Sequence, residues 1–105
     1  MPLNNFLPPY ALELVNYQLN DEVDENTFID INKKVGEEFT SNQSGFLYRE
    51  IGRNEDNTWL VAVFWKTKQD ALNSINNIDE IPNMVKTYMS MINRETIKRS
   101  IFNII

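Results

Sequence analysis

The chain has 105 residues, no histidine, no cysteine and a net charge of −5. This length predicts one domain, and the acidic charge argues against nucleic acid or an anionic membrane surface as a partner. Without histidine there is no imidazole base, no Ser–His triad and no histidine ligand for a metal or haem, and without cysteine there is no thiolate chemistry. We therefore expect no metal and no cofactor, and any chemistry must use carboxylates, Tyr, Lys, Arg, amides or the reactivity of a bound molecule.

Residues 1–10 form an N-terminal arm with three prolines and little hydrophobic periodicity. The arm is either a frayed terminus or a segment ordered against a partner subunit. It lacks the basic start and apolar block of a signal peptide, and the sequence has no apolar run of about 18 residues. We expect a cytoplasmic protein without a membrane span, whose single domain covers residues 11–105.

The first half of the domain predicts a strand, a helix and a second strand. The strand covers 11–19, and the helix covers 25–42 with Asp24 as its N-cap. Gly36 interrupts this helix, and it marks either a close approach to a neighbouring group or simple tolerance of glycine. The second strand covers 46–53. The apolar stripe of the helix consists of Phe28, Ile31, Val35 and Phe39.

The most apolar run of the sequence predicts a central strand within 58–66. A four-residue turn joins it to the preceding strand as a hairpin. Pairing Gly52 opposite Trp59 places alternate residues on two faces. One face then carries Phe46, Tyr48 and Glu50 with Val61, Val63 and Trp65. The other carries Leu47, Arg49 and Ile51 with Leu60, Ala62 and Phe64.

A second helix begins after the N-cap Thr67, and Asp79-Glu80-Ile81-Pro82 breaks it. A further helical piece covers 83–92, and the last strand covers 96–104. The order β-α-β-β-α-β predicts a ferredoxin-like α+β fold, with both helices on one face of a four-stranded antiparallel sheet. The other face remains strongly apolar, so we expect a homodimer formed through it. Its apolar residues are Leu12, Leu14, Leu47, Ile51, Leu60 and Phe64.

Three segments carry a resemblance to a known family over about 11–104. They are Glu13-Leu14-Val15; Ser44-Gly45-Phe46-Leu47 with Arg49-Glu50; and Trp59 followed by Phe64-Trp65-Lys66-Thr67-Lys68. The chain resembles the antibiotic biosynthesis monooxygenase-like domains of the dimeric α+β barrel superfamily. The resemblance implies a dimer that packs sheet against sheet, with a small-molecule pocket between the sheet and the helices of each subunit.

The resemblance also indicates candidate site residues. Trp65 matches a family tryptophan that faces the pocket, and strand alternation brings further side chains to the same side. The candidate catalytic residues are Glu13 and Glu50, and the candidate substrate-binding residues are Trp65, Tyr48, Tyr17, Met84 and Tyr88. Each has a structural alternative: packing for the aromatic residues and for Met84, and solvation or an arginine partner for the carboxylates. Arg49 and Arg99 are candidates for ion pairs between subunits.

Two functions follow from the resemblance. Some members of the family oxidise phenolic or quinol substrates without metal or flavin, and others degrade haem with a histidine on the second helix, which this chain lacks. We expect a cofactor-independent monooxygenase-like protein, in which a carboxylate deprotonates a small aromatic molecule that then reacts with dioxygen. The alternative is a dimeric binding or accessory protein without catalysis.

Overall fold

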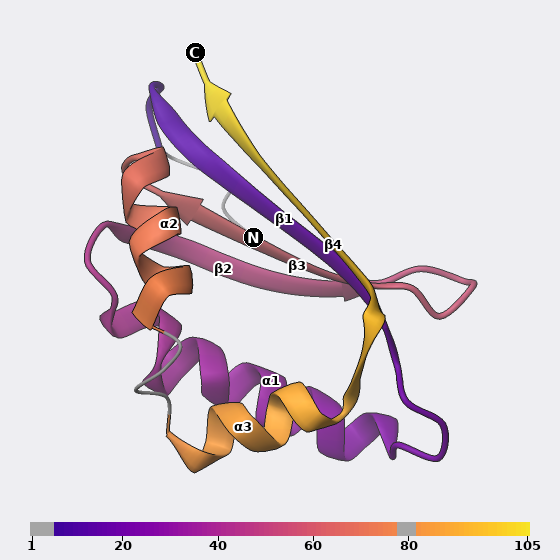
Figure 1. Ribbon diagram of the computed structural model, residues 1–105. Helices are drawn as coiled ribbons and strands as arrows, with labels where there is room; N and C mark the ends of the chain where they lie inside the picture. Colours follow the sequence, from indigo (N-terminus) through magenta and orange to yellow (C-terminus); the bar gives the residue numbers. More distant parts are fainter. Residues whose placement is uncertain (1–5, 78–81) are drawn as a thin grey trace.

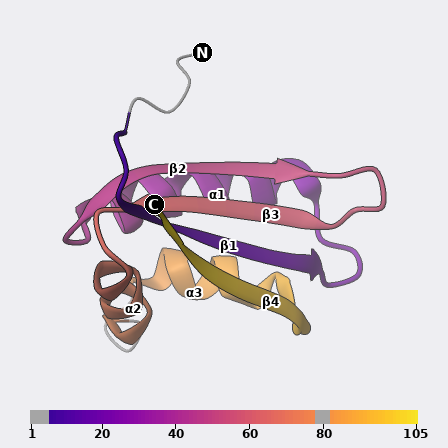
Figure 2. The ribbon, with the colours of Figure 1, turned by 90° about the horizontal axis from the view of Figure 1, so that it is seen from above.

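The computed structural model describes residues 6–77 and 82–105. These residues form one four-stranded antiparallel sheet in the strand order β2-β3-β1-β4, which Figure 2 shows from above. The fold is ferredoxin-like α+β, as the sequence predicts. The elements are β1 (Tyr10–Leu19), α1 (Glu25–Glu38), the short 3₁₀ helix η1 (Thr40–Asn42), β2 (Phe46–Arg53), β3 (Trp59–Trp65), α2 (Lys68–Asn76), α3 (Asn83–Ser90) and β4 (Ile92–Ile104).

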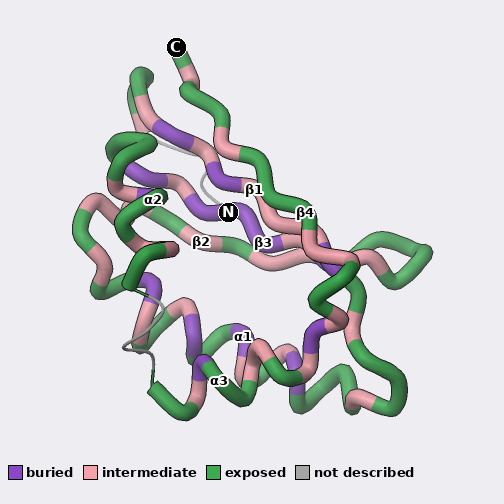
Figure 3. The backbone as a smooth tube through the Cα atoms, viewed as in Figure 1, coloured by how far each residue is buried: buried purple, intermediate pink, exposed green. Residues whose placement is uncertain are grey.

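The helices all lie on one side of the sheet (Figure 1). α1 and α3 run beneath it, and α2 stands at one end. Burial follows this arrangement: buried segments lie on the two central strands and on the sides of α1 and α3 that face inward (Figure 3). The sheet therefore has a helix-side face, which holds the core, and an outer face that no described helix covers.

The helix starts follow the capping residues that the sequence shows. The Asp24 carboxylate accepts a hydrogen bond from the Thr27 amide at 3.0 Å, and the Thr67 hydroxyl accepts one from the Asp70 amide at 3.1 Å. α1 ends at Glu38, four residues before the predicted end. The Ser41 hydroxyl there donates to the Glu37 carbonyl at 2.6 Å. Such local side-chain bonds favour the tighter 3₁₀ turn that follows α1.

The second half differs from the prediction at the boundaries of its elements. The predicted break at 79–82 falls largely outside the described residues, and α3 begins after Pro82, whose carbonyl accepts from Val85 and Lys86 amides. β4 begins at Ile92, four residues earlier than predicted. The pairing of β1 with β4 shifts between Asn16 and Gln18. Because of this shift, the added residues of β4 do not continue the alternation of the predicted strand.

The register of the β2–β3 hairpin was predicted wrongly over most of its length. Phe46 does pair with Trp65 as predicted, but the pairing then shifts between Phe46 and Tyr48. From there Arg53, rather than Gly52, faces Trp59. One extra residue in a strand reverses the faces of all residues beyond it. Arg49 and Ile51 therefore lie on the helix side with Val63 and Val61, whereas Tyr48 and Glu50 lie on the outer face with Phe64 and Ala62.

The outer face is apolar and partly exposed. Phe102 is 52% exposed, and Phe6 of the N-terminal arm packs on Phe64 with ring centroids 6.0 Å apart. Ile51, predicted here, belongs to the helix-side core instead. The strand pairings place Leu12, Leu14, Leu60, Phe64, Phe102 and Ile104 together on this face.

Candidate functional site

A cavity of about 150 Å³ lies between the helix-side face and the helices. Most of its wall is apolar and comes from strands and helices alike. A smaller set of polar side chains also reaches it: Glu13, Tyr17, Thr40, Arg49, Ser74, Tyr88 and Arg99. The valines of its wall are Val15, Val35, Val61, Val63 and Val85. An apolar cavity with a few convergent polar groups is typical of a small-molecule site.

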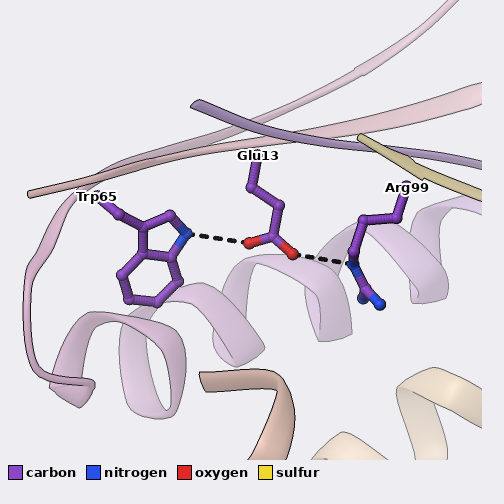
Figure 4. A network of polar contacts seen from close by, with 3 residues as sticks. All are labelled: Glu13, Trp65 and Arg99. Atoms are coloured by element: carbon purple, nitrogen blue, oxygen red, sulfur yellow. Dashed lines mark hydrogen bonds and ion pairs between the residues drawn. The ribbon is translucent and has the colours of Figure 1, made fainter. Parts of the chain in front are cut away.

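One polar group of the cavity is the Glu13 carboxylate, which β1 places there. Glu13 is 5% exposed, and both of its oxygens accept hydrogen bonds. The Trp65 indole donates to Oε1 at 3.0 Å, and the Arg99 guanidinium donates to Oε2 at 3.0 Å (Figure 4). These two bonds explain how a carboxylate is tolerated on an apolar face. Because the Arg99 side chain is 40% exposed, this pair lies where the cavity approaches solvent.

The second polar group is a network of four side chains from β1, α1, β2 and α3. The hydroxyls of Tyr17 and Tyr88 lie 2.8 Å apart, and the Asn32 amide donates to Tyr17 at 3.5 Å. Arg49 donates to the Asn32 carbonyl at 2.9 Å and to its side-chain oxygen at 2.6 Å. Asn32 is fully buried. The network therefore ties the sheet to α1 and α3 beside the cavity.

Burial controls the ionisation of this network. It raises the pKa of the Tyr17 phenol, and the neighbouring Tyr88 raises it further. Burial also raises the pKa of Tyr88, against the opposing effects of the Tyr17 hydrogen bond and the Arg49 charge. The pKa of Arg49 is lowered by burial, although the two tyrosines and Glu13 counteract this. Both phenols are therefore neutral hydrogen-bond donors at neutral pH.

Aromatic packing fixes Tyr88 in place. Its ring stacks on Phe28 with centroids 5.5 Å apart, and Phe28 in turn meets Trp59 edge to face at 5.0 Å. The Tyr17 ring meets the rings of Phe28 and Tyr88 edge to face. This cluster holds α1 and α3 on the sheet and sets one end of the cavity.

The structure brings some of the predicted site residues together and separates others. Glu13, Tyr17 and Tyr88 all line the cavity. Trp65 is 1% exposed and packs on Phe46. It does not line the cavity itself, but its indole holds the Glu13 carboxylate by a hydrogen bond. Met84 is on α3 but does not line the cavity, where Met89 lies instead.

Two predicted site residues were placed on the wrong face. Glu50 and Tyr48 are exposed on β2 and face away from the cavity, because of the register shift near Leu47. The same shift brings Arg49 into the cavity. Arg99, predicted as a candidate for contact between subunits, pairs with Glu13 of its own chain.

The sequence analysis missed Asn32 as a site residue. Asn32 lies one helical turn after Phe28, inside an otherwise apolar stripe, and a polar residue there is a signal for a buried hydrogen-bond network. Gly36 lies one further turn along α1, and the sequence left open whether it marks a close approach to a neighbouring group or simple tolerance of glycine. A Cβ at Gly36 would lie 2.9 Å from Arg49 Nη1, so the glycine makes room for the guanidinium.

The ferredoxin-like fold is shared with solved structures that include proteins named antibiotic biosynthesis monooxygenases. A putative antibiotic biosynthesis monooxygenase from Nitrosomonas europaea is similar with a TM-score of 0.71 and 15% identity, over 97% of this chain and 96% of that one. SnoaB, a cofactor-independent oxygenase from Streptomyces nogalater, has a TM-score of 0.70 and 12% identity, over 93% and 95%. A dimeric ferredoxin-like protein from an uncultured marine organism has a TM-score of 0.63 and 11% identity, over 93% and 90%. At such identities the likeness establishes the fold alone.

No family model and no curated protein matches the sequence. In residues 6–77 and 82–105, no helix has the length and apolar character needed to cross a membrane. The same residues contain no group of three or more acidic side chains placed to hold a metal ion.

Proposed function

We propose that the chain is a cofactor-independent monooxygenase-like protein that handles a small phenolic or quinol molecule in the helix-side cavity. The observation that carries the proposal is a buried carboxylate, Glu13, at the wall of an apolar cavity that also presents two tyrosine hydroxyls. Support for the chemistry comes from SnoaB, which has the same fold and is named a cofactor-independent oxygenase. The proposal assigns the catalytic role to Glu13 and not to Glu50, which lies on the outer face.

The reaction balances without an added reductant. Glu13 accepts a proton from a bound quinol, and Trp65 and Arg99 hold the carboxylate in place. The electron-rich quinol anion then reacts with dioxygen. One oxygen atom replaces a ring hydrogen, the other leaves as water, and the quinol becomes a hydroxyquinone. The protein contributes orientation and exclusion of water.

Oxygen uptake tests this proposal. Purified protein is incubated with single-ring hydroquinones in an oxygen electrode, and the rate is compared with spontaneous oxidation. We expect acceleration, one dioxygen consumed per quinol and no hydrogen peroxide. Glu13→Gln should lower the protein-dependent rate at least tenfold, a typical contribution of a general base being about 10²–10⁴. A Glu13→Gln variant as fast as the wild type would exclude Glu13 as the base.

A second candidate function is binding without catalysis. The observation that favours it is that both Glu13 oxygens already accept hydrogen bonds from donors of the chain itself, so the carboxylate needs no partner from a ligand. In that case the protein is a dimeric carrier or accessory protein for a small molecule. Saturable binding of a ligand without oxygen uptake by any quinol would select this function.

We also propose a homodimer that forms through the outer face. Leu12, Leu14 and Leu60 lie there beside two phenylalanines, and a face of this kind stays stable when apolar surface covers it. A second copy supplies an identical apolar face, and a protein of the same fold is named dimeric. We assign the protein to the cytoplasm, with no nucleic-acid partner, on the basis of its composition and charge.

A further inference from the structure

The helix-side cavity carries an excess of positive charge, although the whole chain is acidic. Its charged lining consists of Glu13, Arg49 and Arg99. Glu13 and Arg99 form an ion pair at 3.0 Å, which leaves Arg49. Within the described part of the chain, the ion pairs are those of Arg99 and Arg53, and neither involves Arg49. The nearest opposite charge that acts on Arg49 is that of Glu13, which already pairs with Arg99. A partly buried cation that shares its counter-ion is costly, and an anion inside the cavity would offset that cost.

The network around Arg49 also has more hydrogen-bond donors than acceptors. A guanidinium has five N–H donors, and Arg49 uses two of them on Asn32 while a further one interacts with the Tyr88 hydroxyl. Tyr17 and Tyr88 each carry a hydroxyl hydrogen, but only one hydrogen fits between their oxygens. The Asn32 amide nitrogen already donates to Tyr17, and its oxygen accepts from Arg49. One phenolic hydrogen and part of the guanidinium therefore remain available to an acceptor in the cavity.

The volume of the cavity suits a ligand with one ring. Its volume is about 150 Å³. A cavity of about 150 Å³ in another protein holds benzene, whereas pockets for drug-sized ligands have about 300–1,000 Å³. The valine-rich wall suits an aromatic ring, and the Arg49–Tyr88 side suits an oxygen atom.

We propose that this cavity binds a single-ring aromatic anion, with its negatively charged oxygen on Arg49 and the Tyr17–Tyr88 pair. The inference rests on the proposed use of this cavity as the small-molecule site, and it adds the charge and the size of the ligand. The anionic oxygen belongs either to a carboxylate on the ring or to an ionised ring hydroxyl.

Benzoate and benzyl alcohol separate charge from shape. Both carry one ring, but only benzoate carries a charged oxygen. Isothermal titration calorimetry of the wild type should show saturable binding of benzoate, and benzyl alcohol should bind about tenfold more weakly or less. Equal affinity for the two would overturn the proposal.

A second arm tests the ionised hydroxyl. 4-Nitrophenol changes its absorption when it loses its proton, so the spectrum reports the charge of the bound dye. At a pH just below the pKa of the free dye, binding should increase the phenolate absorption. Phenolate without benzoate binding assigns the site to ring hydroxyls, and benzoate without phenolate assigns it to carboxylates. Binding of neither anion would overturn the proposal.

Substitutions locate the anion. Arg49→Gln should weaken binding of the anion about tenfold or more, and Arg49→Lys should weaken it less because the charge is kept. The matched control is Arg94→Gln, an exposed arginine on β4, which should leave the affinity unchanged. An equal loss in Arg49→Gln and Arg94→Gln would contradict the assignment. If Arg49→Gln fails to fold, the wild-type comparison of benzoate with benzyl alcohol and the Arg49→Lys variant decide the question.

The outcome is distinguishable from that of the proposed oxidation. Binding of the anion without oxygen uptake by any quinol would support this inference and contradict the oxidation. Turnover of a quinol by a protein that binds neither benzoate nor nitrophenolate would overturn this inference and leave the oxidation standing.

Discussion

The two faces of one sheet differ in what their strands expose. The helix-side face carries Glu13, Tyr17 and Arg49 among its valines, and each of these polar groups has partners inside the domain. The outer face carries leucines and phenylalanines, and its charged residues Glu50 and Lys98 lie on the edge strands β2 and β4. Polar groups are thus enclosed where the helices cover the sheet, while the open face carries apolar side chains mainly along its central strands.

This difference indicates separate roles. Burying polar groups is costly unless they are hydrogen-bonded, so a network such as Asn32–Arg49–Tyr17 provides specificity rather than simple packing. An apolar face without such a network is typical of a surface that associates with another protein chain. This difference supports the proposals that the helix-side face binds the ligand and that the outer face forms the dimer, and the following predictions test that division.

The largest effect is expected at the outer face. Phe102→Glu places a charge in the proposed interface at a position that is 52% exposed in the single chain. The dimer dissociation constant should rise at least a hundredfold, equivalent to about 3 kcal/mol, because a charge is desolvated in an apolar interface. Sedimentation equilibrium measures this change. Leu72→Glu, on α2, is the matched control and should leave the constant unchanged, and an unaltered dimer in Phe102→Glu would move the interface elsewhere.

The tyrosine pair on the helix side predicts how stability depends on alkaline pH. Burial raises the pKa of Tyr17 and of Tyr88 in the folded state, whereas in the unfolded chain a tyrosine pKa is about 10. Above that pH the unfolded chain binds fewer protons than the folded one, so the free energy of unfolding falls as pH rises. Below it, both states keep their phenolic protons and this contribution is fully present.

Tyr17→Phe removes one of these groups. The slope of the unfolding free energy against pH, measured by urea unfolding above about pH 10, should become shallower by up to about 1.4 kcal/mol per pH unit. Tyr48→Phe, which removes an exposed hydroxyl of the outer face, is the matched control variant. Identical slopes for wild type and Tyr17→Phe would mean that the pair ionises as freely in the fold as in the unfolded chain.

A smaller effect is expected where α1 approaches Arg49. Gly36→Ala adds a Cβ 2.9 Å from Arg49 Nη1 and forces the guanidinium to move, which offsets the helix propensity of alanine. In an Arg49→Ala background, the same substitution should instead stabilise the protein by about 1 kcal/mol. Urea unfolding of the four proteins gives the coupling. Gly52→Ala, whose added Cβ meets nothing within 4 Å, should show none, and no coupling for Gly36→Ala would contradict the close approach.

The smallest effect is expected for Glu50→Gln. Glu50 is exposed on the outer face, so its substitution should change stability by less than about 0.5 kcal/mol and leave ligand affinity unchanged. Thermal unfolding and the benzoate titration measure both quantities. A loss of affinity that equals the effect of Glu13→Gln would mean that both faces contribute to the ligand site.

Much of the fold follows from local patterns in the sequence. The caps Asp24 and Thr67 mark helix starts, and regular alternation in β1 correctly assigns Glu13 and Tyr17 to the helix side. Alternation fails in β2, because the extra residue near Leu47 exchanges the faces of Arg49 and Glu50. Neither the composition of β2 nor the spacing of its apolar residues predicts the bulge between Phe46 and Tyr48.

The site was less predictable than the fold because it depends on contacts between distant elements. Asn32 is a visible exception in an apolar stripe, but its partner Arg49 can be identified only once the register is known. The pairing of Glu13 with Arg99 joins residues 86 positions apart, and the volume of the cavity depends on how α3 packs on the sheet. Neither is encoded in a local pattern.

Methyl NMR tests the division between the two faces most directly. The valines of the cavity wall and the leucines of the outer face carry distinguishable methyl groups, and selective ¹³C labelling observes both during a titration with benzoate. We predict that binding shifts the methyl signals of Val15, Val61, Val63 and Val85, while those of Leu12, Leu14 and Leu60 remain in place. Shifts confined to the leucines would contradict the account, because they would place the ligand on the outer face.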